Sequence, residues 1–442
     1  MKAGRCFGML WAGVLATGLI AGCLHIQEAV PLQLEQESGT SPTREPAPQD
    51  RASIWPQRWS KSEDVRGAII PMEGTLRDWV GVRLGEDHYL RSVPEDASDA
   101  AAAARVARME TGYQYVLEGP GAFVFRKADR SLKGRPTSST PDAMFRFVSG
   151  RPMGKTNGVE VVMIERTWFA YYDAAKAGER RGLIVMVPGL FGVPEPVNDR
   201  FVELCVQDGW AVLRMLSHPS RFTERTRFPI DIADMGASAQ RIADELGQRA
   251  AEVAYAAQAG VRHVHKIRPQ IEDEPHVLIG MSGGAMAGPT VHALEPEVYD
   301  AVVLVAGGAN FLMVNEESNY AGWVQAINLD WGVPFDRLAD GDKHLADLSN
   351  AYMERAPLDA YHLAALVRGK PVLVLQASAD KAVPSRFGDQ LWERLGQPER
   401  WKFAAGHELL FLTLNNFTPS ILKWLDEHVG AESAPAADGA GE

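Results

Sequence analysis

Residues 275–288 read PHVLIGMSGGAMAG and decide the fold. The apolar VLI run is typical of a buried strand, Ser282 follows among glycines, and the small residues after it suit a helix. A G-x-S-x-G match between a strand and a helix predicts a nucleophile elbow, a sharp turn that exposes the serine hydroxyl. Side chains at Gly280 and Gly284 would collide with the adjacent strand and helix, whereas the N–H of Gly283 would point at a carbonyl oxygen that gains charge. The alternative is a glycine-rich turn without a chemical role.

Two further candidates follow the serine at the ends of later strands. Asp380 lies in the loop 376–384 after an apolar strand, and His407 comes directly after the next strand. A serine hydroxyl is a weak nucleophile at neutral pH, so it needs a base, and the base needs a carboxylate that orients it. Parallel strands collect their functional loops at their carboxyl ends, so we expect these side chains to meet. Glu408 and Asp359 are alternative carboxylates, but the position after a strand favours Asp380.

From about residue 180 the chain alternates strands with helices, which predicts a parallel sheet covered on both faces. The apolar run Leu183–Val187 indicates a strand that is buried on both sides. A long amphipathic helix is expected at 232–259, where apolar residues recur at three- and four-residue steps, and a closing helix at 411–428. The predicted fold class is therefore α/β.

On these signals, residues 145–428 resemble an α/β hydrolase. The resemblance rests on the elbow at 280–284, the acid loop and the histidine, which follow one another in the order Ser, Asp, His. The segment 188–192, PGLFG, occupies the place of the family's oxyanion loop, with Pro188 where the common form has histidine. The resemblance implies a mostly parallel central sheet flanked by helices.

The same resemblance implies a role for each candidate residue. Ser282 would be the nucleophile, His407 its base, and Asp380 the group that holds the imidazole. The backbone N–H groups of Leu190 and Gly283 would form the oxyanion hole. This chemistry requires neither a metal nor an organic cofactor.

The implied function is hydrolysis of carboxylic esters through an acyl-enzyme, with a small-molecule or lipid-like acyl substrate. A peptidase, a thioesterase or an acyltransferase stays open, because the fold and the triad do not determine the leaving group or the acceptor. A non-catalytic surface-binding module is the alternative of another class. Such a module would have no need of all three side chains.

The N-terminus resembles a bacterial lipoprotein signal. Lys2 and Arg5 precede an apolar run at 7–20 that is too short to span a bilayer comfortably, and small residues then lead to Cys23. The resemblance implies cleavage before Cys23 and attachment of lipid to it, which would anchor the protein in a bacterial cell envelope. Leu24 in place of aspartate favours the outer membrane or the cell surface. An ordinary signal peptide is the alternative.

The chain is expected to divide into a core domain with additions at both ends and one insertion. The insertion, at about 307–365, is longer than a parallel crossover needs and is rich in aromatic residues. It predicts a helical cap that walls the site, or else a satellite core packed on the sheet. The other expected units are a signal peptide at 1–22, a disordered tether at 23–60, an N-terminal accessory segment at 61–144, the hydrolase domain at 145–428 and a disordered tail at 429–442.

The accessory segment is expected to hold a helix at 96–109 and two strands, at 113–117 and 122–126. Two interpretations of it stay open. It is either a separate addition or the source of the first strands of the main sheet.

Composition excludes some functions. The chain has 442 residues and a net charge of −12 without a basic patch, which argues against nucleic acid as a partner. Cys205 lies on the apolar face of an expected helix, which predicts a buried thiol. His263 and His265 have no third ligand in register, which favours a solvated helix end over a metal site. His218, near the end of an expected strand, either lines a pocket or belongs to a plain loop.

Overall fold

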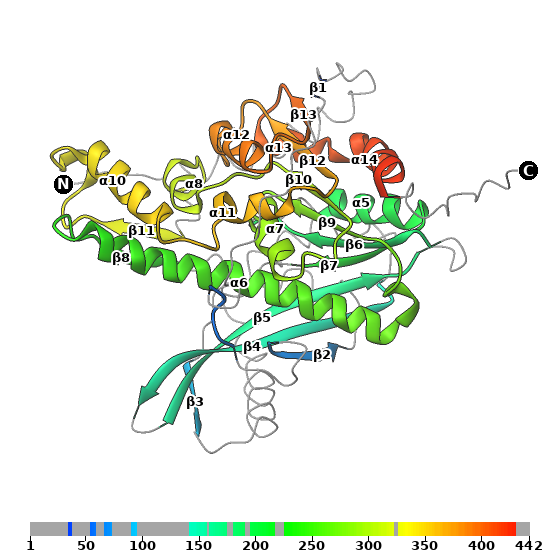
Figure 1. Ribbon diagram of the computed structural model, residues 1–442, viewed down its shortest axis with the longest axis horizontal. Helices are drawn as coiled ribbons and strands as arrows, with labels where there is room; N and C mark the ends of the chain where they lie inside the picture. Colours follow the sequence, from blue (N-terminus) through cyan, green and yellow to red (C-terminus); the bar gives the residue numbers. More distant parts are fainter. Residues whose placement is uncertain are drawn as a thin grey trace, which may run out of the picture.

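The computed structural model describes residues 34–37, 54–58, 66–72, 90–94, 141–156, 159–174, 180–190, 195–216, 225–321 and 326–429. Within them, helices cover both faces of one large, twisted sheet (Figure 1). Several sequence predictions lie outside the described residues: the signal peptide, Cys23, the helix at 96–109, the strands at 113–117 and 122–126, His218 and the tail beyond 429.

The central sheet has eleven strands in the order β1-β13-β12-β10-β9-β6-β7-β5-β4-β2, and β3 also pairs with β5. The neighbouring strands from β13 to β7 run parallel, and the pairs beyond them at either edge are antiparallel. This mostly parallel sheet with flanking helices confirms the predicted α/β-hydrolase fold. The strands are β1 (Leu34–Glu37), β2 (Ala68–Met72), β3 (Leu90–Pro94), β4 (Ala143–Thr156), β5 (Val159–Tyr172), β6 (Gly182–Val187), β7 (Trp210–Met215), β9 (His276–Met281), β10 (Ala301–Val305), β12 (Val372–Ala377) and β13 (Glu399–Phe403).

Alternate residues of the central strands enter two different cores. In β6, Leu183 and Val185 pack in the core that holds α6 and α7, whereas Ile184 and Met186 pack in the core that holds α5 and α14. Every residue of β6 is therefore buried, as its continuous apolar run predicts. The helices are α5 (Glu195–Gln207), α6 (Met235–Ile267), α7 (Gly283–Leu294), α8 (Phe311–Glu317), α10 (Gly341–Met353), α11 (Ala360–Leu363), α12 (Ser385–Arg394), α13 (His407–Leu412) and α14 (Leu414–Val429), with the 3₁₀ turns η1 (Pro269–Ile271), η2 (Phe335–Arg337) and η3 (Ala364–Val367).

The long helix α6 links the sheet to the insertion. Its N-cap is Asp234, whose side chain accepts a hydrogen bond of 3.0 Å from the N–H of Ala237. A helix of 33 residues extends for about 50 Å, whereas a six-residue strand spans about 20 Å. One half of α6 must therefore reach past the sheet. Its C-terminal half carries Val253 into the main core, and its N-terminal half carries Ile242 into a separate core.

That separate core belongs to the cap, which two parts of the chain build together. A short parallel sheet joins β8 (Thr226–Pro229) to β11 (Ile327–Asp330), and α10 packs against α6 beside it. Phe228 and Ile242 come from before the elbow, whereas Leu312 and Tyr352 come from the insertion. The predicted insertion at 307–365 is thus only one of the two parts. The cap has a core of its own.

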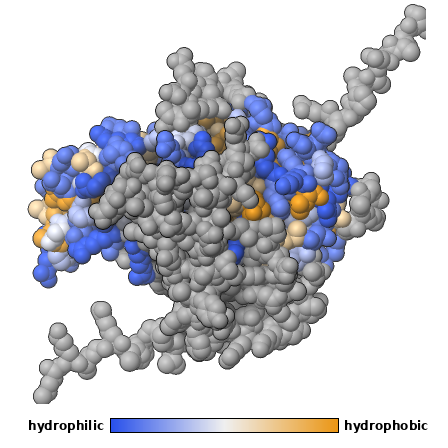
Figure 2. Space-filling view, turned by 90° about the horizontal axis from the view of Figure 1, so that it is seen from below, coloured by the Kyte–Doolittle hydropathy of each residue, from blue (hydrophilic) through white to orange (hydrophobic). Residues whose placement is uncertain are grey.

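The cap exposes apolar side chains at its outer end. Val333 and Phe335 are 48% and 41% exposed. Figure 2 shows apolar surface interspersed with polar surface at the end of the molecule that α10, β8 and β11 occupy.

The expected disordered tether at 23–60 is wrong at two places. β1 pairs with the edge strand β13, whose outer backbone groups would otherwise lack partners. At 54–58, Trp55 and Arg58 are buried, and Arg58 bonds to α6. Likewise, β2 and β3 pair with β4 and β5, so these parts of the expected accessory segment 61–144 belong to the main sheet.

Cys205 lies on α5 and is fully buried in the core. Burial raises the pKa of its thiol well above the ordinary value, which keeps the group neutral. The predicted buried thiol is therefore confirmed. Among the helices of the described residues, none is both long and apolar enough to cross a bilayer.

Candidate active site

Ser282 lies on the turn between β9 and α7. Its backbone has φ 53° and ψ −116°, a conformation that residues other than glycine rarely adopt. Its N–H donates to the carbonyl of Val305 on the adjacent strand at 2.7 Å, which holds the turn against the sheet. A Cβ added at Gly280 would lie 2.5 Å from the carbonyl oxygen of Gly284, and one added at Gly284 would lie 2.2 Å from that of Val187. The steric need for glycine at both positions, predicted from the sequence, is confirmed.

The structure brings the three sequence candidates together at the carboxyl edge of the sheet. The hydroxyl oxygen of Ser282 lies 2.9 Å from Nε2 of His407, and Nδ1 of His407 lies 2.7 Å from Oδ2 of Asp380. The histidine and the aspartate are only 5% and 7% exposed. Because an ionised carboxylate only accepts hydrogen bonds, Asp380 favours the tautomer with hydrogen on Nδ1. That tautomer leaves the Nε2 lone pair to accept from the serine hydroxyl.

The backbone of its own loop holds Asp380 in place. Its Oδ1 accepts hydrogen bonds from the N–H groups of Ala382 and Val383 at 2.9 and 2.8 Å, which leaves Oδ2 for the imidazole. Both carboxylate oxygens thus have hydrogen-bond partners. A carboxylate with two oxygens satisfied in this way has little freedom to rotate away from the histidine.

The two alternative carboxylates have other partners. Asp359 accepts from the N–H groups of Asn310 and Phe311 and from the hydroxyl of Tyr352, so it joins the start of α8 to α10 within the cap. Glu408 accepts a hydrogen bond from the hydroxyl of Tyr320 in the cap, and not from the imidazole of His407. Of the three carboxylates considered from the sequence, Asp380 is the one that contacts the imidazole of His407.

Both expected oxyanion donors lie around the serine. Gly283 is the first residue of α7, where a backbone N–H has no acceptor within the helix. Gly189 approaches so closely that a Cβ on it would lie 3.0 Å from Cβ of Ser282, and Leu190 follows it in the same cavity wall. The loop after β6 and the turn after β9 therefore both line the cavity at Ser282.

A cavity of about 310 Å³ opens beside Ser282 and His407. Leu246 and Ala250 of α6 form part of its wall, together with Val314 of α8 and Ile327 of β11. These apolar groups come from both parts of the cap. The insertion thus lines the cavity beside the serine in addition to contributing to the core of the cap.

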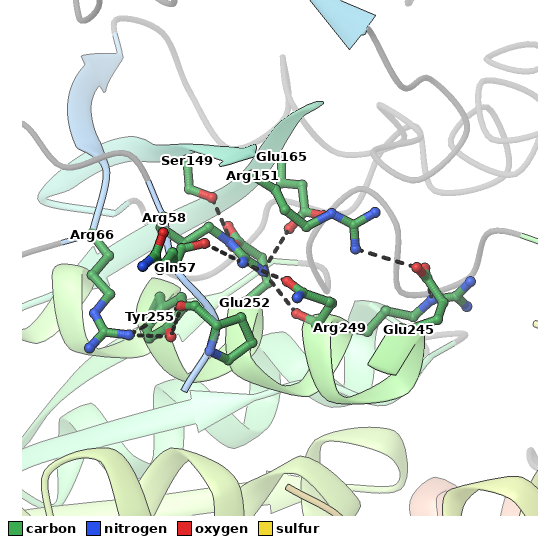
Figure 3. Close-up of polar contacts among 12 residues, drawn as sticks. Gln57, Arg58, Arg66, Ser149, Arg151, Glu165, Glu245, Arg249, Glu252 and Tyr255 are labelled. Atoms are coloured by element: carbon green, nitrogen blue, oxygen red, sulfur yellow. Dashed lines mark hydrogen bonds and ion pairs between the residues drawn. The ribbon is translucent and has the colours of Figure 1, made fainter. Parts of the chain in front are cut away.

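Arg249 also lines the cavity, and a buried chain of charges compensates it (Figure 3). Its Nε donates to Glu245 at 2.9 Å, and Glu245 lies 3.4 Å from Arg151. Arg151 then approaches Glu165 at 3.8 Å. Positive and negative groups alternate from the cavity wall to the far side of α6. The guanidinium of Arg249 is therefore not an isolated charge in the cavity wall.

Arg58 occupies the far end of this chain. Its Nε donates to Glu252 at 2.8 Å, and its guanidinium lies 3.7 Å from Glu165, with all three side chains buried (Figure 3). The hydroxyl of Ser149 also donates to Glu252 at 2.8 Å. Burial, reinforced by the charge of Glu165, raises the pKa of Glu252 to about 8 although Arg58 opposes the shift.

This raised pKa predicts a pH-dependent stability. The folded state holds the proton of Glu252 more tightly than the unfolded chain, so this group favours folding most below pH 4.5 and loses that contribution as pH rises toward 8. Between pH 5 and pH 8.5 the free energy of unfolding should fall in wild type. In Glu252→Gln this fall should be smaller by about 1–3 kcal/mol. Urea unfolding at both pH values measures it. Glu427→Gln, which removes a 57% exposed carboxylate, should keep the wild-type slope, and equal slopes for Glu252→Gln would contradict the prediction.

The two helix-end histidines are half-buried and have partners, so the expected solvated end is wrong for them. The ring of His263 packs on Phe145 with centroids 4.4 Å apart, and Nε2 of His265 lies 2.7 Å from Nε2 of His276. Burial lowers the pKa of all three histidines. Within the described ranges, no three histidine, cysteine or carboxylate side chains gather as metal ligands would.

Sequence reasoning missed Arg249 and the pair formed by Tyr320 and Glu408. For Arg249 a signal existed, because an arginine stands between Leu246 and Ala250 on the apolar stripe of a helix, where a charge needs a buried partner. For Tyr320 and Glu408 there was none, since 88 residues separate them.

Neither a protein-family model nor a curated protein matches this chain. Solved structures do align with it. A cold-adapted esterase from an Arctic intertidal metagenomic library is 17% identical, with 64% of this chain and 94% of that chain covered and a TM-score of 0.35. Est1E from Butyrivibrio proteoclasticus is 13% identical over 62% and 97%, with a TM-score of 0.38. The acylaminoacyl peptidase of Pyrococcus horikoshii is 13% identical over 64% and 48%, with a TM-score of 0.40.

Proposed function

We propose that this protein is a serine hydrolase that cleaves carboxylic esters through an acyl-enzyme. The observation that carries the proposal is the continuous chain of short contacts from Ser282 through His407 to Asp380, beside a cavity with apolar walls. A nucleophile, a base within reach of it and a carboxylate that orients the base are the parts that acyl transfer requires.

The reaction would proceed in two balanced steps. Oγ of Ser282 attacks the ester carbonyl while Nε2 of His407 takes its proton, and the N–H groups of Leu190 and Gly283 hold the oxyanion. The bond to the alkoxy oxygen then breaks, and the imidazolium returns the proton to the departing alcohol. Water, deprotonated by the same imidazole, attacks the acyl-serine. The bond between the acyl carbon and Oγ then breaks, the imidazolium returns the proton to Oγ of Ser282, and the carboxylic acid leaves. Asp380 stabilises the imidazolium in both steps.

The proposal is tested by hydrolysis of p-nitrophenyl esters from C2 to C16 and by labelling with a fluorophosphonate, with Ser282→Ala as the control. Wild type should hydrolyse at least one ester and take the label, whereas the variant should do neither. Labelling without ester hydrolysis would leave the activated serine and favour a peptidase, a thioesterase or an acyltransferase. Resistance of wild type to both would favour a non-catalytic surface-binding module.

We also propose a location for the protein in the bacterial cell. A signal at 1–22 and lipid on Cys23 would place the enzyme on a bacterial envelope membrane, with the outer membrane or the surface as its address. Expression in a bacterium with radiolabelled palmitate tests this. Wild type should incorporate the label and fractionate with membranes, whereas Cys23→Ala should incorporate none. An unlabelled, secreted wild-type protein would indicate an ordinary signal peptide.

A further inference from the structure

The two sides of the cavity differ in chemistry. Toward α6 and β11 its walls are mainly apolar, whereas beside His407 it is lined by Tyr320, Glu408 and Phe411. The base must return its proton to the leaving oxygen, so the departing alcohol has to lie on the histidine side. The groups around His407 therefore face the alcohol part of the substrate.

Two aromatic rings and a carboxylate surround this side. The ring of Tyr320 meets the imidazole edge-on with centroids 6.1 Å apart, and Phe411 lies 5.0 Å away at 68°. The hydroxyl of Tyr320 donates to Oε1 of Glu408 at 2.5 Å. The N–H of Asn319 donates to the carbonyl of Lys381 at 2.8 Å, so this segment of the cap is joined to the loop of the catalytic aspartate.

The charges in the cavity wall are unequal. Among the described lining residues, Arg249 and Glu408 are the fixed charges, and Glu245 compensates the first. Glu408 makes no ion pair with a cationic side chain of the described residues, although Tyr320 bonds to it. Burial raises the pKa of Glu408, but the hydrogen bond from Tyr320, a backbone hydrogen bond and the charge of His407 together hold it below the ordinary value. The carboxylate is thus negative at neutral pH.

We infer that the alcohol part of the substrate carries a positively charged nitrogen, which Glu408 recognises together with the rings of Tyr320 and Phe411. The inference rests on the proposed ester hydrolysis. The substrate class would be esters that join an apolar acyl chain to an amino alcohol or a quaternary ammonium alcohol. Aromatic faces and a carboxylate each attract such a cation, whereas a neutral alcohol of equal shape gains neither interaction.

Two esters of nearly equal shape test the inference. Butyrylcholine and 3,3-dimethylbutyl butyrate differ in having nitrogen or carbon at the centre of the same trimethyl group. In the full chain at low ionic strength, kcat/KM should be about five- to twentyfold higher for the cationic ester. The ratio should fall as salt is added, because the carboxylate is exposed.

Variants then show which side chain produces the ratio. Glu408→Gln should bring it close to one, and because both esters are measured on the same variant, a general loss of activity cancels. Glu427→Gln, which removes an exposed carboxylate on α14, should keep the wild-type ratio. Tyr320→Leu should lower the ratio in part by removing one ring.

The outcomes separate this inference from the proposed function. A wild-type ratio near one, or a ratio that Glu408→Gln leaves unchanged, would overturn the inference while ester hydrolysis stands. So would hydrolysis of p-nitrophenyl butyrate together with inertness toward both matched esters. Failure to hydrolyse either matched ester or any p-nitrophenyl ester from C2 to C16 above the rate of Ser282→Ala would overturn the inference and the ester-hydrolase proposal together.

Discussion

Asp380→Asn is expected to lower kcat by about 10²- to 10⁴-fold with little change in KM, because the substitution removes the charge that orients and stabilises the imidazolium. Asparagine is nearly isosteric, and its carbonyl oxygen can still accept from the N–H groups of Ala382 and Val383, which now hold Oδ1. The loop should therefore keep its shape. The amide would instead place N–H groups or a neutral oxygen against Nδ1 of His407, so the tautomer that activates Ser282 is no longer selected.

The measurement is steady-state hydrolysis of the preferred p-nitrophenyl ester, with thermal unfolding to verify the fold. Asp389→Asn is the matched control, because that carboxylate is 47% exposed and pairs with Arg400, away from the imidazole. It should retain the wild-type kcat. If Asp380→Asn stayed within threefold of wild type, the carboxylate beside His407 would not have the proposed role, and Glu408 would become the candidate to test.

Arg58→Met is expected to destabilise the folded protein by about 3–5 kcal/mol, because it leaves Glu165 and Glu252 buried without the cation between them. It also removes the bonds of the guanidinium to Gln248, at 2.7 Å to the side chain and 3.0 Å to the carbonyl. The loss should be smaller at pH 5 than at pH 8, because Glu252, whose pKa burial raises to about 8, is protonated at the lower pH and does not need the cation there.

Urea unfolding of the full chain at both pH values measures this effect. Arg386→Met is the matched control, since that arginine pairs with Glu317 but is 61% exposed, and the change should stay within about 1 kcal/mol. Adding Glu252→Gln to Arg58→Met should recover part of the stability lost at pH 8, because the amide cannot ionise there. Equal losses for the two arginine variants would show that 54–58 is not fastened to α6 as the structure indicates.

Local patterns were sufficient to predict the elements that position the candidate site. The glycines of the elbow were expected because a Cβ has no room there, and the contacts at Gly280 and Gly284 confirm it. Ser282, Asp380 and His407 were selected by their place after buried strands, and a parallel sheet brings such positions to one edge. Their catalytic roles remain the proposal tested above.

Predictions for the ends and the cap were less successful, for a common reason. The segment 23–60 looks like a tether because Pro and polar residues interrupt it, yet Arg58 is buried where Glu165 and Glu252 create a need for a cation. No local pattern around Arg58 shows that need. The cap was assigned to 307–365 alone, because a stretch before the elbow gives no sign that its short strand pairs with a distant one.

By itself, then, the sequence determined the alternation of strands and helices, the turn that exposes Ser282 and the order in which the candidate residues arrive. These follow from the period of apolar residues and from backbone sterics, which act over a few neighbouring positions. Only the tertiary structure decided which carboxylate meets His407, that Arg249 is compensated within the wall, and that Tyr320 bonds to Glu408 beside the base. Such contacts join residues that lie far apart in the chain, and their energies depend on burial and on partners that exist once the chain has folded.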